Sequence, residues 1–302
     1  MATVEGPLPA PSGWRVWWLA ARPRTLALAV APVLLGTVIA HAHDAARALP
    51  ALAALAGALL LQVGANFAND VFDAEHGADT TERIGPPRAT QMGWLAPAQV
   101  KRATLLVFAA SALVGAYLVA IGGWPIAVLG LLAIAAGFAY TGGPLPLGYL
   151  GLGDVAVFLF FGLAAVCGTY YVQAGALPGV VIAASLPAGA LATAVLVVNN
   201  ARDIDADRAA GKRTLAVRFG RGAARAEYTV LLALAYAVPA ALALGGRAPL
   251  AVLLTALSLP LALLLARNVT YLEDGPSLNT ALAGTARLAL VHAALFAVGW
   301  ML

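Results

Sequence analysis

Nine stretches of mostly apolar residues follow one another along this chain, and they limit the possible folds more than any other feature of the sequence. Each is close to the roughly 20 residues that an α-helix needs to cross the hydrocarbon core of a bilayer. We therefore expect an all-α integral membrane protein: a single domain over residues 1–302, built as a bundle of nine transmembrane helices, with residues 1–13 as a flexible N-terminal tail. The expected spans are 23–42, 49–68, 103–121, 124–141, 154–173, 177–198, 227–244, 249–266 and 282–301.

The composition supports a lipid environment and excludes a soluble protein. Hydrophobic residues make up 62% of the chain and charged residues 11%, whereas soluble domains are about 45–50% apolar and about 25% charged. The net charge of +4 comes from basic residues between the apolar stretches, so membrane lipid is an expected partner and nucleic acid is not. The single cysteine, Cys167, allows neither a disulfide framework nor a cysteine metal site within the chain.

The distribution of basic residues predicts the orientation of the bundle. With the N-terminus in the cytoplasm, all but two of the 18 Lys and Arg residues fall on the cytoplasmic side, and only Arg47 and Arg247 fall outside. This asymmetry follows the positive-inside rule and supports nine spans with an external C-terminus in the cell membrane. Residues 40–42 resemble a signal-peptide cleavage site, but the long apolar run before them and the spans after them favour a first transmembrane helix.

Acidic residues gather in two short stretches. Of the 14 acidic residues, five follow the second apolar span and three follow the sixth. Both stretches contain the pattern Asn-x-x-x-Asp, and residues four apart share one face of a helix. Because the two helices run in the same direction, both acidic ends are expected at the cytoplasmic face. The residues are Asp70, Asp73, Glu75, Asp79 and Glu82 in the first stretch and Asp203, Asp205 and Asp207 in the second.

Carboxylates gathered at a membrane edge repel one another and are costly to bury, so they need cations. Magnesium prefers oxygen ligands and is commonly bound by one or two carboxylates together with substrate phosphates. We therefore expect two or more Mg²⁺ ions and a diphosphate here. Two solvated acidic loops are the alternative, but the matched spacing and the Asn residues inside the last apolar turns favour the metal site. The candidate ligands are Asn66, Asn69, Asp70, Asp73, Asn199, Asp203 and Asp207, whereas Asp205 is expected to face solvent.

Basic residues flank both acidic stretches and the start of the first span. Cations beside carboxylates suit a polyanionic ligand, because they neutralise phosphate oxygens that no metal contacts. The alternative is that they only set the topology, which is the expected role of Arg218, Arg221 and Arg225. The candidate diphosphate-binding residues are Arg22, Arg83, Arg202, Lys212 and Arg213, together with the amides of Asn66, Asn69 and Asn199.

Taken together, these segments resemble the UbiA superfamily of intramembrane prenyltransferases. The resemblance runs from about residue 14 to the C-terminus, and it is closest to the 1,4-dihydroxy-2-naphthoate polyprenyltransferases of menaquinone biosynthesis. It rests on Arg22-Pro23-Arg24-Thr25, Asn69-Asp70-Val71-Phe72-Asp73, Tyr140-Thr141-Gly142-Gly143-Pro144, Gly148-Tyr149-x-Gly151-x-Gly153-Asp154 and Asn199-Asn200-x-Arg202-Asp203-x-x-x-Asp207-x-x-x-Gly211-Lys212-Arg213.

The resemblance implies Mg²⁺-dependent transfer of a polyprenyl group from a polyprenyl diphosphate to an aromatic acceptor at the cytoplasmic side. For the closest branch, the acceptor is 1,4-dihydroxy-2-naphthoate, which loses CO₂ to give demethylmenaquinone. Tyr140 and Tyr149 could offer aromatic faces to the allylic cation, or they could be interface anchors at helix ends. Asp154 could act on the acceptor, or it could cap a helix N-terminus.

The sequence also departs from the superfamily pattern. Gly77 stands where a further Asp is common, and Asp79 is the candidate replacement as a metal ligand. No Lys or Arg occurs between Arg102 and Arg202, which favours the naphthoate branch over the branch that uses 4-hydroxybenzoate. Two alternatives remain open at this point: prenyl transfer to another aromatic acceptor such as 4-hydroxybenzoate, and a cation-coupled transporter.

Overall fold

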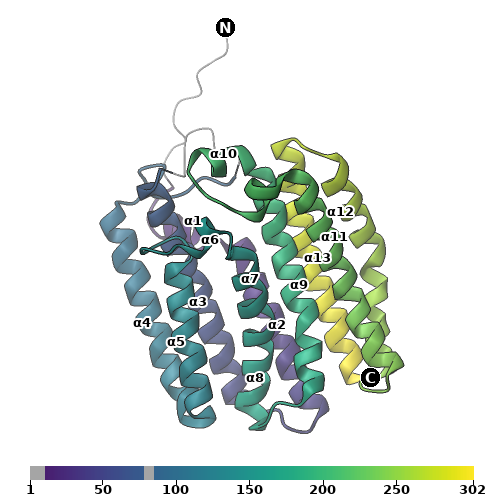
Figure 1. Cartoon of the computed structure of the whole chain (residues 1–302). Helices are drawn as coiled ribbons and strands as arrows, with labels where there is room; N and C mark the ends of the chain where they lie inside the picture. Colours follow the sequence, from purple (N-terminus) through teal and green to yellow (C-terminus); the bar gives the residue numbers. More distant parts are fainter. Residues whose placement is uncertain (1–10, 78–84) are drawn as a thin grey trace.

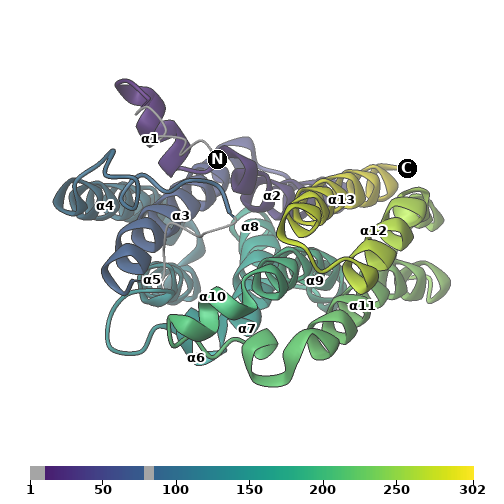
Figure 2. The same cartoon turned by 90° about the horizontal axis from the view of Figure 1, so that it is seen from above.

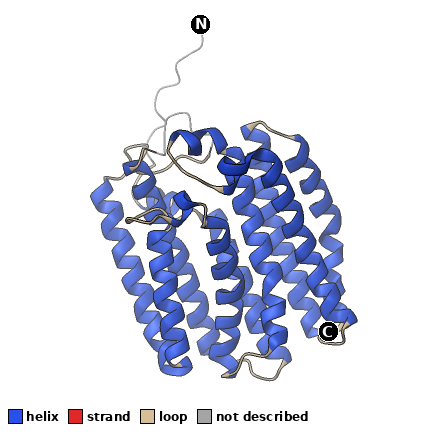
Figure 3. Cartoon of the chain, in the orientation of Figure 1, coloured by secondary structure: helices blue, strands red, loops and turns tan. Residues whose placement is uncertain are grey.

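The computed structural model describes residues 11–77 and 85–302 of the chain. Within these ranges every regular element is a helix and none is a strand (Figure 3). The all-α class expected from the apolar stretches is therefore confirmed for the part of the chain that the structure describes.

Each of the nine apolar stretches forms a helix, and eight of these helices are long and apolar enough to cross a membrane. The exception is α5, whose 16 residues span only about 24 Å, less than the roughly 30 Å of a hydrocarbon core. The helices are α2 (Pro23–Ala42), α3 (Ala48–Glu75), α4 (Pro97–Gly122), α5 (Trp124–Ala139), α7–η1–α8 (Gly153–Val157, Phe158–Ala164 and Ala165–Ala174), α9 (Gly179–Arg202), α11 (Leu215–Leu244), η2–α12 (Leu250–Ser258 and Leu259–Tyr271) and α13 (Gly275–Met301).

Several helices extend beyond the predicted spans at the end that carries the acidic residues. The segment of α11 begins at Leu215, well before the predicted span over 227–244, and Thr214 caps its first turn by accepting the N–H of Val217 at 3.2 Å. Gly220, with φ 80° and ψ 177°, interrupts the helix after this turn. The basic residues Arg218, Arg221 and Arg225 lie on both sides of the interruption and lower the hydropathy, so the apolar pattern predicted only the later part of α11.

Helix α5 ends earlier than predicted, at Ala139 rather than at residue 141. After it the chain turns back on itself, and Gly148 donates its N–H to the carbonyl of Tyr140 at 2.8 Å. Gly143 has a φ of 75°, a left-handed value that Gly adopts without steric cost. This turn brings Tyr140 and Tyr149 to the same end of the bundle as the acidic residues.

The short helices α1 (Trp14–Ala20), α6 (Leu147–Leu150) and α10 (Ile204–Ala209) gather at one end of the bundle, and the C-terminal end of α13 lies at the other (Figure 1). Seen from above, α6 and α10 lie over the part of the bundle that contains α7 and α9 (Figure 2). Helix α1 does not belong to any of the predicted spans. Its Trp17 packs edge-on against Phe67 of α3 at 5.7 Å, while Trp14 and Trp18 are exposed, as expected for a helix at a membrane–water interface.

The segment that follows α7 is a π-helix, η1, and it crosses α9 at very short distance. A Cβ atom on Gly162 of η1 would lie 2.7 Å from the Cα of Gly189 in α9. Small residues let helix backbones approach in this way inside a bilayer. The crossing fixes α7, and with it Asp154 in the first turn of α7, against the middle of α9.

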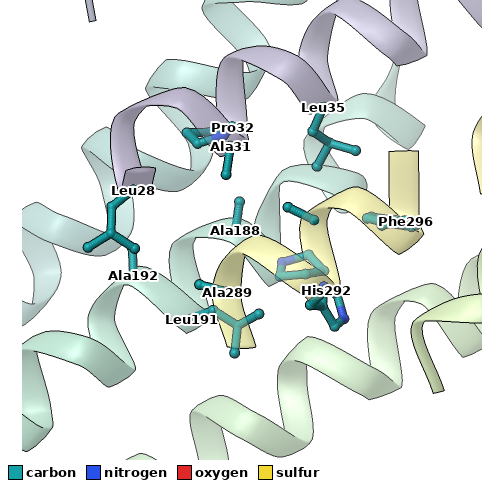
Figure 4. Close-up of a pocket in the computed structure, with 12 residues that line it drawn as sticks. Leu28, Ala31, Pro32, Leu35, Ala188, Leu191, Ala192, Ala289, His292 and Phe296 are labelled. Atoms are coloured by element: carbon teal, nitrogen blue, oxygen red, sulfur yellow. The ribbon is translucent and has the colours of Figure 1, made fainter. Parts of the chain in front are cut away.

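An apolar pocket opens between α2, α9 and α13, and its lining includes Leu28, Pro32, Leu191 and Phe296 (Figure 4). One polar side chain, His292 of α13, lies at its edge and is almost completely buried. The Nε2–H of His292 donates to the carbonyl oxygen of Ala235 in α11 at 3.0 Å.

The partner of His292 follows from a proline. Pro239 lies inside α11 and has no N–H to give to the carbonyl four residues earlier, which is that of Ala235. A backbone acceptor without a donor is costly in a bilayer. His292 supplies the missing donor, so its role here is to stabilise the α11–α13 contact.

We predict that His292→Leu lowers the free energy of unfolding by about 1–2 kcal/mol, the range reported for hydrogen bonds between membrane helices. The loss should be smaller in a Pro239→Ala background, because the restored N–H can satisfy Ala235. Unfolding of the four variants in detergent micelles measures this double-mutant cycle. An equal loss in both backgrounds would contradict the assignment.

Candidate active site

The two acidic stretches meet at the end of the bundle where α10 lies. Asp73 comes from the last turns of α3, and Asp207 comes from α10, just after α9. The Nζ atom of Lys212 lies 3.4 Å from Asp73 Oδ1 and 3.4 Å from Asp207 Oδ1. Residues more than 130 positions apart in the sequence therefore surround one ammonium group, and the carboxylates are close enough to share a cation.

Among the described residues, three side chains contact the carboxylate of Asp73: Arg88, Tyr149 and Lys212. This carboxylate is 3% exposed; Arg88 Nη1 lies 2.7 Å from Oδ2, and the hydroxyl of Tyr149 donates to Oδ1 at 2.9 Å. The same Arg88 nitrogen donates to the carbonyl of Asn69 at 2.6 Å. A buried carboxylate needs both opposite charge and hydrogen bonds, and here three separate segments supply them.

Asp70 binds the loop before α4. Its Oδ2 accepts the N–H of Ala89 at 3.0 Å and its Oδ1 accepts the N–H of Thr90 at 2.9 Å. These bonds hold the segment that carries Arg88 against α3, so Asp70 positions the cation that neutralises Asp73. Carboxylate oxygens have further lone pairs, so these bonds leave Asp70 able to bind another ligand.

The asparagines of the first stretch have different surroundings. Asn69 Oδ1 accepts the hydroxyl of Thr141 at 2.9 Å, which ties α3 to the turn after α5. Asn66 Nδ2 donates to the carbonyl of Ala21 at 2.8 Å and to Thr25 Oγ1 at 3.1 Å. Asn66 therefore fixes the start of α2, next to Arg22, rather than pointing at the carboxylates.

Arg22 has an unusual backbone conformation. It is the N-cap residue of α2 with φ 53° and ψ 68°, in the left-handed region that non-Gly residues rarely adopt. Thr25 donates its N–H and its hydroxyl to the Arg22 carbonyl, each at 2.9 Å. Backbone held in such a conformation requires support from its surroundings and is often found at functional sites.

The second stretch departs from the predicted continuous helix. Helix α9 ends at Arg202, Asp203 has φ −99° and ψ 13°, and α10 begins at Ile204. Asn199, Asp203 and Asp207 therefore do not form one straight row, although Asp207 still donates its N–H to the Asp203 carbonyl at 2.7 Å. Asp205 is exposed, as expected.

Arg202 explains why the helix ends there. Its buried guanidinium donates to both oxygens of Asp203, at 2.7 Å from Nε and 2.5 Å from Nη2. It also donates to Asn199 Oδ1 at 2.9 Å and to Asn279 Oδ1 of α13 at 2.5 Å. These paired hydrogen bonds hold the Asp203 carboxylate against the last turn of α9. Arg202, predicted to bind diphosphate, is thus committed to protein groups in this structure.

The loop after α10 places Lys212 and Arg213. The Lys212 N–H donates to the Asp207 carbonyl and the Arg213 N–H to the Tyr149 carbonyl, both at 2.8 Å. Lys212 Nζ also lies 4.9 Å from the centre of the Tyr149 ring, within cation–π range. The side chain of Arg213 is exposed. Burial raises the pKa of Asp207, and Lys212 opposes that shift.

Asp154 belongs to a neighbouring polar group. Leu152, not Asp154, is the N-cap of α7, so the predicted capping alternative is wrong. Asp154 Oδ1 instead accepts the side-chain N–H of Asn200 at 3.4 Å. A Cβ on Gly153 would lie 2.9 Å from the Tyr140 hydroxyl, so Tyr140 also reaches this group.

Two residues of this region were not among the predicted site residues. Arg88, one of the cations that follow the first acidic stretch, is the direct partner of Asp73. Glu227 of α11 is half-buried. A signal for Glu227 was present: it and Asp154 are the only acidic residues inside the predicted spans. The predicted residues Asp79 and Arg83 lie outside the described residues.

The donor chemistry fits Mg²⁺, although the described residues contain no group of three or more His, Cys, Asp or Glu side chains arranged to hold a metal ion. Carboxylate and amide oxygens are the ligands that Mg²⁺ accepts, and it usually keeps several waters. Asp73 and Asp207 already face one cation, Lys212. Arg88, Arg202 and Lys212 now neutralise the carboxylates that would bind the metal.

Comparisons with known proteins give consistent findings. The profile described as "UbiA prenyltransferase family" matches residues 29–300. A 1,4-dihydroxy-2-naphthoate octaprenyltransferase from Haemophilus influenzae is 38% identical over 299 residues, covering 95% of this chain and 96% of that protein. An enzyme of the same name from Mycobacterium tuberculosis is 46% identical over 220 residues, covering 72% and 75%.

A solved structure shares the fold. The UbiA homolog from Archaeoglobus fulgidus bound to DMAPP and Mg²⁺ superposes with a TM-score of 0.67, covering 93% of this chain and 99% of that one. The two sequences are 16% identical, so this likeness concerns the fold alone.

We predict that Arg88→Met lowers the free energy of unfolding by about 3 kcal/mol, the low end of the range for breaking a buried ion pair, because Lys212 and Tyr149 still contact Asp73. Thermal unfolding in micelles measures the change. Arg102→Met removes an exposed cation at the same end of the bundle and should stay within about 0.5 kcal/mol of the wild type. Equal effects of the two substitutions would show that the Arg88–Asp73 contact contributes nothing.

Proposed function

This chain belongs to the UbiA prenyltransferase family, and from that premise we propose that it transfers a polyprenyl group to 1,4-dihydroxy-2-naphthoate. The immediate product would be demethylmenaquinol, the hydroquinone form of demethylmenaquinone, formed with loss of CO₂ and inorganic diphosphate. The support is the name shared by two relatives at 38% and 46% identity, one of them matched over nearly its whole length.

One structural observation carries the proposal: the acidic ends of α3 and of α9–α10 converge, and cationic side chains stand among them. If Mg²⁺ neutralises the carboxylates, the cationic side chains beside them can bind the oxygens of a diphosphate. The residues proposed to hold two or more Mg²⁺ ions are Asp70, Asp73, Asp203 and Asp207, with Asn66, Asn69, Asn199 and Asp79 as further candidates. When bound, the metal would stabilise the charge that develops on the leaving diphosphate.

Cationic residues are proposed to bind the diphosphate oxygens that the metal does not reach. Lys212 already lies between the two acidic segments, and Arg22 stands at the start of α2, which Asn66 of α3 contacts through the carbonyl of Ala21. Arg213 is exposed at the same loop. Arg83 and Arg202 complete the proposed set, with Arg202 acting through its hold on Asp203.

The acceptor is proposed to bind on the membrane side of the diphosphate, where Asp154, Asn200 and Tyr140 lie together. These groups can bind the ring hydroxyls, and a neighbouring carboxylate can take a hydroxyl proton. Tyr149 lies between the two sites, with its hydroxyl on Asp73. In the reaction the allylic C–O bond breaks, a C–C bond forms at the ring carbon that bears the carboxyl group, and that carboxyl group leaves as CO₂.

The apolar pocket between α2, α9 and α13 has a volume of only about 20 Å³, and we propose that it widens to take the start of the prenyl tail (Figure 4). Leu28, at one end of its lining, lies less than two turns after Arg22 on α2, which is roughly 9 Å along the axis. Apolar walls at this position exclude water from the allylic group, so that the ring and not water captures it.

We also propose nine membrane crossings with the site at the cytoplasmic face of the cell membrane. Eight of the helical segments from α2 to α13 are long enough to cross, and in this proposal the shorter α5 makes the remaining crossing. The end of α13 lies opposite to α10, which is consistent with an odd number of crossings (Figure 1). Arg47 and Arg247 are the only two of the 18 Lys and Arg residues in the connections at the other end.

The test of the activity is product analysis by mass spectrometry. Membranes containing the protein would receive dihydroxynaphthoate, a polyprenyl diphosphate and Mg²⁺, and we expect a prenylated naphthoquinone without the carboxyl group that disappears with EDTA. Prenylation of 4-hydroxybenzoate alone would keep the reaction class and exclude this acceptor. Cation transport into proteoliposomes without any prenylated product would replace the enzyme by a transporter.

We predict that the double substitution Asp73→Asn and Asp203→Asn lowers the turnover rate at least 100-fold, since one well-placed electrostatic group is worth about 10²–10³ in rate. The amides keep hydrogen-bonding atoms, so the protein should remain folded. Asp205→Asn, which removes the same charge at an exposed position of α10, is the matched control and should keep the wild-type rate. Full activity of the double variant would exclude both carboxylates from the reaction.

A further inference from the structure

Lys212 binds both acidic segments at once. Its Nζ atom contacts Asp73 Oδ1 and Asp207 Oδ1, each at 3.4 Å, and lies over the Tyr149 ring. The side chain is only 16% exposed. These three partners come from α3, α10 and α6, so one ammonium group holds together the elements that form the site.

The backbone around Lys212 fixes this arrangement. Gly211 has a φ of 75°, which turns the chain after α10. The backbone N–H of Lys212 donates to the carbonyl of Asp207, and the next N–H, that of Arg213, donates to the carbonyl of Tyr149. By contrast, Arg208 of the same segment reaches only exposed Asp205 and is itself 58% exposed. Lys212 is therefore directed into the site and is not a surface lysine that meets an acid by chance.

The ammonium group competes with any metal ion for the same oxygens. A divalent cation that binds Asp73 and Asp207 would be repelled by a positive charge already between them. The ammonium group of Lys212 must move away from Asp73 and Asp207 before such an ion can bind well. Its positive charge then needs another partner. A diphosphate provides one, because its oxygens accept charge-assisted hydrogen bonds from an ammonium group.

We propose that Lys212 couples the two binding events, so that Mg²⁺ enters the site together with the prenyl diphosphate and not before it. The diphosphate draws Lys212 away from Asp73 and Asp207, and the freed carboxylates then bind the metal. By linkage, the metal strengthens diphosphate binding by the same factor. This inference rests on the proposed diphosphate substrate but not on the identity of the acceptor.

The choice of lysine fits this role. Lys is a point charge on a flexible stem, whereas Arg forms a fork with fixed geometry. Arg202 makes hydrogen bonds to Asp203, Asn199 and Asn279, and Arg88 binds both Asp73 and the Asn69 carbonyl. Those two cations are fixed by several bonds, while Lys212 can move to a new anion through rotations of its side chain.

The experiment measures metal affinity without turnover. Mn²⁺ serves as a spectroscopic probe for the Mg²⁺ site, and its binding to the full-length protein in micelles is followed by electron paramagnetic resonance. We expect Lys212→Met to bind Mn²⁺ about tenfold more tightly than the wild type when no diphosphate is present, which is within the usual range of coupling between sites. Inorganic diphosphate should then increase Mn²⁺ affinity about tenfold less in the variant than in the wild type, after correction for Mn²⁺ bound to free diphosphate.

Controls separate coupling from general electrostatics and from misfolding. Arg208→Met removes one positive charge from the same segment without touching Asp73 or Asp207, and it should change Mn²⁺ affinity less than twofold. Lys212→Gln should behave as Lys212→Met does, and Mg²⁺ alone should raise the melting temperature of both Lys212 variants more than that of the wild type. Unchanged Mn²⁺ affinity in both Lys212 variants, or an equal gain in Arg208→Met, would overturn the proposal.

The outcome is independent of the product assay. If Mn²⁺ binding responds as expected but no acceptor is prenylated, the coupling stands and the proposed reaction fails. If the prenylated naphthoquinone forms but Lys212→Met leaves Mn²⁺ affinity unchanged, the reaction stands and Lys212 is only a phosphate ligand.

Discussion

The burial of Asp73 is the constraint on which the site depends. A carboxylate at 3% exposure is stable there only because Arg88, Tyr149 and Lys212 all contact it. Each partner comes from a different connection between spanning helices: the loop before α4, the turn after α5 and the loop after α10. One buried charge thus determines where three loops lie. The same requirement brings the second acidic segment close, because Lys212 also reaches Asp207.

The helices and the two acidic segments could be predicted because they depend on residues that are close together in the sequence. A run of apolar residues near bilayer length has few other folds available, and the extension of α3 through Asp70 and Asp73 follows from continuing its period. Pairings across loops could not be predicted in this way. Nothing in the spacing distinguishes Arg88 from its neighbouring cations, and the break at Asp203 depends on a guanidinium that reaches Asn279, far along the chain.

Similar reasons explain the other differences. The apolar pattern missed α1 because its seven residues are too few to show a helical period, and its Trp residues can serve equally in a loop at the interface. The pattern also overestimated α5, since hydropathy does not register the turn that begins at Tyr140. His292 shows the opposite case: a lone His in a span suggests function, yet Pro239 gives it a structural task.

The close crossing of Gly162 and Gly189 has a consequence for how substrates of such different size could reach one site. Two backbones without side chains between them leave no gap for a lipid-like chain and little freedom to separate. The contact between η1 and α9 is therefore closed at this level. An isoprenoid that diffuses in the bilayer would have to enter between other helices, of which α2 and α13 border the apolar pocket.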